Sequence, residues 1–338
     1  MSRLRPLSVL PLLLAACAAG SPSSNCDTDA CASTVRTIES CDTDIPTSAS
    51  ADAAADEARQ LDFFRKYFRC VSVAVTSDHN FTVTSSGLSP HKSWYYAPGD
   101  PNYEPFPAAA DAATCAANPC PGLQRGAASC RADGVCRFQN PNRIGEKSLA
   151  FTIPRSPVRR SGVPDQVPTS MVDRTMNTNG FEYRGGPVGV ALDSVAIFND
   201  AAAPGDDIDQ ERYGFDAYDG HPTPDATYHY HSTTPGPLEV LAAAGLVTNA
   251  TPGTAEVELY GIMCDGTLVL GCTELDGSAV APGPALDAQN GHVGDISDGS
   301  TTYFPARYHT HVCPGVLTAH KYTPEIQYYE GLATNCPK

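Results

Sequence analysis

The stretches "GVALDSVAIFN" (residues 189–199) and "GIMCDGTLVLG" (residues 261–271) align without a gap, and this repeat decides the expected fold. Both stretches begin with glycine, carry aspartate at the fifth position and are otherwise mostly apolar. Short apolar runs interrupted by Gly and Asp are typical of β-strands joined by turns. The chain is therefore expected to contain a duplicated β unit.

Two further pairs of motifs repeat downstream in the same order. "DAYDGH" (216–221) matches "DAQNGH" (287–292), and "YHYH" (228–231) matches "YHTH" (308–311). One such coincidence is weak evidence by itself. Three blocks in one order indicate an internal duplication.

The remaining apolar runs also predict strands, because each is bounded by Gly, Pro, Asn or Asp. They are "CVSVAVT" (70–76), "FTVTSS" (81–86), "SLAFTIP" (148–154) and "AEVELYGIM" (255–263). The expected fold is mainly β: a disulfide-stabilised, β-sandwich-like domain with an internal pseudo-duplication and one or two short helices. The helix candidates are residues 52–70, with acidic residues early and basic residues late, and residues 237–247.

The N-terminus has a short apolar run that ends in "LAAC" (14–17), which looks like a bacterial lipobox. The run is too short to span a bilayer as a permanent helix. We expect residues 1–17 to be a lipoprotein signal peptide and Cys17 to be lipidated; an ordinary secretory signal is the alternative. The protein is then expected in the cell envelope, anchored to a membrane by lipid. The outer membrane is favoured because Ala18 rather than Asp follows the cysteine.

Composition divides the rest of the chain. Residues 18–56 are rich in Ser, Thr, Ala and Asp and are expected to form a low-complexity tether. Residues 57–338 are expected to form the domain, with a cysteine-rich insertion at about 97–147. The net charge of −16, with only 22 Lys and Arg, argues against nucleic acid as a partner.

Removing Cys17 from the thirteen cysteines leaves twelve, an even number. The chain has no C-x-x-C pair and is expected to be exported, so the twelve are interpreted as disulfides formed in an oxidising compartment. Connectivity cannot be deduced from sequence. The preferred pairs are Cys264 with Cys272, across a predicted hairpin, and Cys313 with Cys336.

The histidines define the candidate site. Residues two apart in a strand face the same side, so the two histidines of each Tyr-His-x-His motif project together. Imidazoles at this spacing can converge on one ion at about 2.0–2.1 Å. A pseudo-twofold axis could bring both pairs to one place, with a histidine from each Gly-His turn and with Asp216 and Asp287 holding the imidazole tautomers. The expected metal ligands are His221, His229, His231, His292, His309 and His311.

Copper or zinc is the expected ion, on ligand type and stability order. The acidic loop at residues 204–220 lacks EF-hand spacing, which disfavours calcium. Half-buried structural histidines and acid–base chemistry without metal remain open, although no G-x-S-x-G nucleophile motif occurs. The alternative function is a cell-surface module that binds glycan or protein. Whether the protein is an enzyme, and which small molecule or surface ligand it meets, is left open.

Five segments together resemble the bacterial YHYH proteins, a family named for its Tyr-His-Tyr-His motif. They are "TSSGLSPH" (84–91), "GVALDSVAIF" (189–198), "GHPTPDATYHYHS" (220–232), "YGIMCDGTLVLG" (260–271) and "LDAQNGH" (286–292) followed by "YHTH". The resemblance covers roughly residues 70–338 apart from the insertion. It implies an exported or surface protein without an established activity, and it adds His91 as a possible further site residue. The chain departs from the family pattern at Cys264, where a local disulfide could replace aromatic packing.

Overall fold

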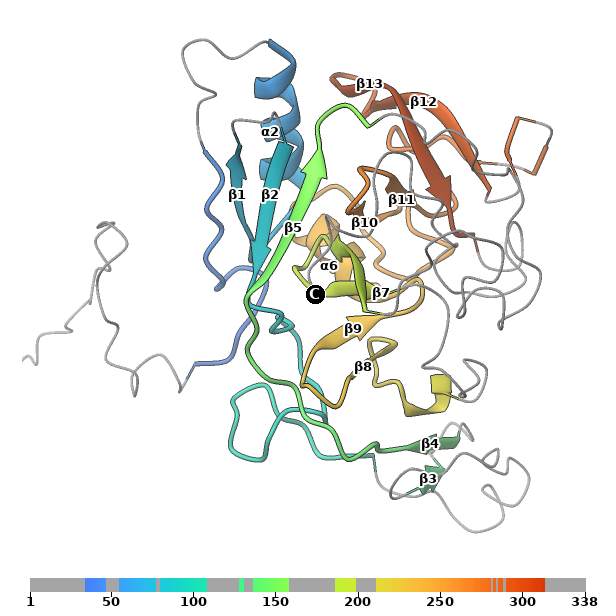
Figure 1. Ribbon diagram of the computed structural model, residues 1–338. Helices are drawn as coiled ribbons and strands as arrows, with labels where there is room; N and C mark the ends of the chain where they lie inside the picture. The colour runs from blue at the N-terminus through green and yellow to red at the C-terminus, as the bar shows by residue number, and fades with distance from the viewer. Residues whose placement is uncertain are drawn as a thin grey trace, which may run out of the picture. The chain divides into compact units, whose positions relative to one another are not determined.

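Both copies of the duplicated unit lie in one eight-stranded sheet (Figure 1). The computed structural model describes residues 34–46, 55–76, 80–107, 128–130, 136–157, 186–198, 211–280, 282–283, 285–287 and 290–313. The strand order of this sheet is β12-β13-β11-β10-β6-β7-β9-β8. Its strands are β6 (Pro187–Ala191), β7 (Ala196–Phe198), β8 (Gly220–Pro222), β9 (Tyr228–Tyr230), β10 (Leu259–Met263), β11 (Leu268–Leu270), β12 (Gly291–Ser297) and β13 (Thr302–His311).

A pseudo-twofold axis passes through the middle of this sheet. The strand order is symmetric about the antiparallel pair β6–β10, with β7 and β11, β9 and β13, and β8 and β12 at matching places. Val190 pairs with Ile262 in that central register, and these two residues are equivalent at the repeat spacing seen in the sequence. The predicted internal duplication is confirmed, and the axis lies between the two copies.

Each copy is built on the same hairpin. In the first copy the Ala191 N–H donates to Val195 O at 2.8 Å, and in the second the Met263 N–H donates to Thr267 O at 2.8 Å. The second turn contains Gly266 at φ 87°, a left-handed conformation that favours glycine. The repeat in sequence therefore produces a repeat in backbone hydrogen bonding.

A second sheet has three strands in the order β1-β2-β5. These are β1 (Ser72–Val75), β2 (Asn80–Ser85) and β5 (Leu149–Pro154). Helix α2 (Ala55–Tyr67) packs between this sheet and the larger one, because the Phe64 ring lies 5.0 Å from Phe81 on β2 and the Phe63 ring lies 5.0 Å from Phe304 on β13. Buried residues of both sheets belong to one hydrophobic core.

The other described elements are short. They are the hairpin β3 (Ala128–Cys130) and β4 (Cys136–Phe138), the 3-10 turn η1 (Arg212–Gly214) and helix α6 (Pro235–Ala243). Thr234 caps α6 and Pro235 occupies its first turn, where a missing N–H costs nothing. The mainly β fold and the two predicted helices are confirmed. Within the described ranges, no helix is long and apolar enough to cross a membrane.

The preferred disulfide pairs are wrong. Cys272 is bonded to Cys313, and Cys41 is bonded to Cys70. β11 and β13 are adjacent parallel strands, so their carboxyl ends meet at one edge and bring Cys272 within 4.6 Å of Cys313 between Cα atoms. Cys264 is also in a disulfide. Cys336 and the predicted signal with Cys17 lie outside the described residues.

Candidate metal sites

Three histidines converge on one face of β8 and β9. His221 on β8 lies directly opposite His229 on β9, and His231 follows two residues later on the same side. Their ligand nitrogens all lie within 4.8 Å of one another. His221, His229 and His231 are called the first histidine cluster below.

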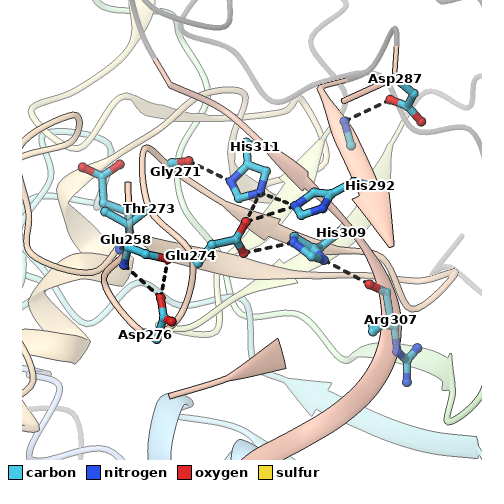
Figure 2. Close-up of polar contacts among 12 residues, drawn as sticks. Glu258, Gly271, Thr273, Glu274, Asp276, Asp287, His292, Arg307, His309 and His311 are labelled. Atoms are coloured by element: carbon cyan, nitrogen blue, oxygen red, sulfur yellow. Dashed lines mark hydrogen bonds and ion pairs between the residues drawn. The ribbon is translucent and has the colours of Figure 1, made fainter. Parts of the chain in front are cut away.

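The second copy reproduces this arrangement and adds a carboxylate (Figure 2). His292 on β12 pairs with His309 on β13, and His311 follows on the same strand. Glu274, in the turn after β11, points its carboxylate among the three rings. The ligand atoms of these four residues also lie within 4.8 Å of one another. They are called the second histidine cluster.

Backbone carbonyls fix which imidazole nitrogen carries the proton. His229 Nδ1 lies 3.0 Å from Thr227 O, and His309 Nδ1 lies 3.0 Å from Arg307 O. A carbonyl oxygen can only accept, so Nδ1 must donate and the Nε2 of the neutral ring keeps its lone pair. His311 is fixed in the same way by Gly271 O at 3.1 Å.

The Nε2 atoms of each cluster lie close together, and those of His229, His309 and His311 carry a lone pair when the ring is neutral. His229 Nε2 lies 2.9 Å from His231 Nε2, and His292 Nε2 lies 3.3 Å from His311 Nε2. In the second cluster His309 Nε2 also lies 3.1 Å from a Glu274 carboxylate oxygen. Two facing lone pairs repel at these distances, and the repulsion is relieved by a cation, by an additional proton, or by a tautomer that places N–H on one of the two nitrogens.

Burial makes the additional proton costly in the first cluster. His221, His229 and His231 are 2 to 5% exposed, and Phe198 stacks on His229 at 3.8 Å. Burial, followed by the neighbouring imidazoles, holds the pKa of His229 well below its ordinary value. Burial likewise lowers the pKa of His221, whose Nε2 has no hydrogen-bond partner among the described residues.

The second cluster is more accessible and carries a negative charge. The side chains of Glu274 and His292 are each 26% exposed, whereas His309 and His311 are fully buried. Burial opposes ionisation of Glu274, but its close polar contacts with the His309 and His311 rings prevail and lower the pKa of this carboxyl. Burial is also the main cause of a lowered pKa at His292.

Asp216 and Asp287 do not hold the imidazole tautomers as expected. Their described contacts include the tyrosines of the motifs: the Tyr228 hydroxyl donates to Asp216 at 2.8 Å, and the Tyr308 hydroxyl donates to Asp287 at 2.7 Å. The reason is strand alternation, which places these tyrosines on the face opposite the histidines. The backbone carbonyls supply the orientation instead.

His91 also lies on that opposite face and is not part of either cluster. Its Nε2 lies 2.9 Å from the Tyr230 hydroxyl, which donates to Asp193 at 2.7 Å. The ring stacks on Tyr218 with 3.6 Å between centroids. His91 is thus part of a buried polar network beneath β9.

The two histidine motifs do not converge on one place. β9 and β13 are five strand steps apart in the sheet, which is roughly 24 Å at the usual strand spacing. Figure 1 accordingly shows β8 and β9 far from β12 and β13. The expected pseudo-twofold axis exists, but it runs through β6 and β10 and leaves the histidines on the outer strands.

Sequence reasoning missed two carboxylates near the clusters. Glu274 has no repeat partner to mark it, since position 202 holds Ala at the repeat spacing of the hairpins. Glu211 Oε1 lies 3.8 Å from His221 Nε2, but Glu211 is not among the converging groups. In the sequence, Glu211 lies in an acidic loop, and no pattern distinguishes it from the other acidic residues of that loop.

One family model matches the chain. The model described as YHYH protein matches residues 150–279, a range that includes the first cluster and Glu274 and ends before His292. No curated protein and no solved structure matches the chain. Residues 150–279 are thus similar to the YHYH family, and the Tyr-His-Tyr-His motif in this range, residues 228–231, supplies two of the three histidines of the first cluster.

Proposed function

We propose that this protein binds transition-metal ions at two separate sites, one at each histidine cluster. The observation that carries the proposal is the convergence of three imidazole rings in each cluster. Backbone carbonyls hold the Nδ1 protons of His229, His309 and His311 and so direct their Nε2 atoms inward. Such rings are oriented for a cation before it arrives, as metal-ligating histidines usually are. The duplicated geometry supports the same chemistry twice.

The ligand sets favour zinc or copper. Imidazole suits both ions, and calcium and magnesium prefer sites made of oxygen ligands. The second cluster offers three nitrogens and one carboxylate oxygen, the number that a tetrahedral zinc ion takes. The first cluster offers three nitrogens in a closed, buried setting, so we expect its ion to exchange more slowly.

The cellular setting belongs to the same proposal. The lipobox at Cys17 and the abundant cysteines support an exported lipoprotein held at the envelope membrane. An oxidising compartment preserves the Cys272–Cys313 disulfide beside the second cluster. Metal binding by a tethered, exported protein is thus the function that the sequence and the sites support together.

Metal content of the purified protein tests the proposal. Protein loaded with zinc or copper and then desalted is expected to retain about two ions per chain, because the clusters are separate. His231→Ala should remove one ion and His311→Ala the other, and the double variant should retain none. Elemental analysis measures each content directly.

His91→Gln is the matched control, because His91 is a buried histidine outside both clusters. It is expected to retain both ions. If the parent protein retains no metal, and His231→Ala destabilises the chain equally with and without a chelator, the histidines are structural. The protein is then better described as a surface interaction module.

A further inference from the structure

The Cys272–Cys313 disulfide joins the two chain segments that build the second histidine cluster. Cys272 precedes Glu274 by two residues, and Cys313 follows His311 by two residues. The Gly271 carbonyl that orients His311 lies immediately before Cys272. The covalent bond therefore lies directly beside the ligands of this cluster.

Glu274 sits in a small turn that closes on Cys272. The Glu274 N–H donates to Ser278 O at 2.8 Å, and the Val280 N–H donates to Cys272 O at 3.0 Å. Thr273 and Ala279 form a bridge across the turn. Motion of the turn relative to β13 would therefore carry the Glu274 carboxylate with it.

Hydrogen bonds with Glu258, the residue before β10, also tie the base of the turn to the core. The Glu258 N–H donates to Thr273 Oγ1 at 2.9 Å. The Cys272 N–H donates to the buried carboxylate of Glu258 at 2.9 Å. These bonds fix the turn to the start of β10, whereas the disulfide fixes it to the segment directly after β13, the strand that carries two of the cluster's histidines. The disulfide is the described covalent link between Glu274 and those histidines.

The first copy carries no cysteine at either corresponding position. Asp200 stands where the repeat spacing of the hairpins aligns Cys272, and Thr233 follows His231 as Cys313 follows His311. The disulfide thus accompanies the copy that contains Glu274. This difference provides an internal comparison within one chain.

We propose that the Cys272–Cys313 disulfide positions Glu274 as the fourth ligand of the second histidine cluster. This inference rests on the proposed metal binding. A carboxylate held against the imidazoles loses little freedom when the ion binds, because the disulfide has already restricted it. Without the disulfide, the turn that carries Glu274 becomes ordered only when the ion binds, and this loss of freedom lowers the affinity for the metal. The first cluster is independent of this effect.

Zinc affinity of the second cluster alone tests the positioning role. In a His231→Ala background only this cluster binds, and competition with a chromophoric chelator gives its dissociation constant. Replacing both Cys272 and Cys313 by Ser should weaken zinc binding about tenfold or more, as loss of a supporting group commonly does. Replacing both Cys41 and Cys70 by Ser removes the other described disulfide and should leave the affinity unchanged.

A double-mutant cycle shows whether the effect passes through Glu274. Glu274→Gln should weaken binding by itself, and adding it to the Cys272/Cys313 double variant should bring little further loss. Copper(II) loaded into the double variant should also show an electron paramagnetic resonance spectrum changed toward fewer oxygen ligands. Additive losses, or an unchanged zinc affinity in the double variant, would overturn the inference.

Binding at the first cluster distinguishes a local effect from misfolding. In a His311→Ala background the Cys272/Cys313 double variant should bind zinc at the first cluster with parental affinity. A loss there as well would show general damage and contradict local positioning. If the His231→Ala parent binds no zinc, the proposed metal function itself fails at the second cluster.

Discussion

At the scale of single residues, each cluster depends on which imidazole nitrogen faces inward. A backbone carbonyl two residues before His229, and again before His309, accepts a hydrogen bond from the Nδ1–H. This contact is local, because the acceptor lies only two residues before the ring in the sequence. The local backbone therefore orients each of these two rings. Asp216 and Asp287 accept hydrogen bonds from tyrosines instead.

His91 gives a prediction on pH. Burial lowers its pKa to about 3 in the folded protein, where it faces Tyr230 and Tyr218. Between pH 6.5 and about 3 the unfolded chain binds a proton at this residue and the folded protein does not. The free energy of unfolding therefore falls as the pH drops from 6.5 to about 3. One proton bound only by the unfolded chain lowers it by about 1.4 kcal/mol per pH unit.

His91→Gln should remove this part of the pH dependence. Urea unfolding of metal-free parent and variant at a series of pH values measures the difference in the free energy of unfolding. The comparison is needed because burial raises the pKa of Asp193 to about 7, which acts in the opposite direction as pH falls. Parallel stability curves for the two proteins below pH 6.5 would contradict the assignment.

At the scale of elements, β9 and β13 each separate a histidine face from a tyrosine face. The histidines gather with β8 or β12, while Tyr228 and Tyr308 donate to aspartates on the other side. The aspartate in each copy also accepts the N–H of the glycine that begins β8 or β12. One carboxylate thus connects the turn before the short strand to the histidine strand.

The two tyrosines form a matched pair for mutation. Asp216 is buried, which raises its pKa to about 7, whereas Asp287 is exposed. Tyr228→Phe leaves a buried carboxylate with one donor fewer and should lower the free energy of unfolding by about 1–3 kcal/mol. Tyr308→Phe should cost about 0.5–1 kcal/mol, because water can replace the lost donor. Urea unfolding at pH 8 measures both; equal losses would show that burial of Asp216 does not decide the cost.

At the scale of the whole molecule, the duplication sets where the two sites lie. The copies meet at β6 and β10, and their motifs occupy the outer strands of one sheet. Helix α2 ties the second copy to the smaller sheet through Phe63 and Phe64. The copies are thus alike at their centre and differ at their edges, where a carboxylate and a disulfide accompany the second cluster.

Membrane attachment is a prediction about the whole chain. Cys17→Ser should release the exported protein from the membrane fraction, because lipidation requires the cysteine of the lipobox. Fractionation of cells expressing parent and variant, with detection of the protein in each fraction, makes the measurement. A Cys17→Ser variant that stays equally membrane-bound would point to attachment by another part of the molecule.

The amino-acid sequence alone determined the mainly β class, both helices, the duplication and the histidines of both clusters. These follow from local pattern: apolar runs between turn residues, charges ordered along α2, and histidines at the two-residue period of a strand. The family resemblance likewise rested on contiguous motifs such as residues 228–231, and the YHYH family model matches that part of the chain.

Only the tertiary structure decided that there are two clusters and that Glu274 joins one of them. Strand order depends on pairings between segments that are distant in the sequence. A sequence repeat does not determine which strands lie beside the pseudo-twofold axis. The Cys272–Cys313 bond has the same origin, since the parallel pairing of β11 and β13 brings the two cysteines together. Local pattern selects which side chains share a face; packing of the sheet selects which of those faces meet.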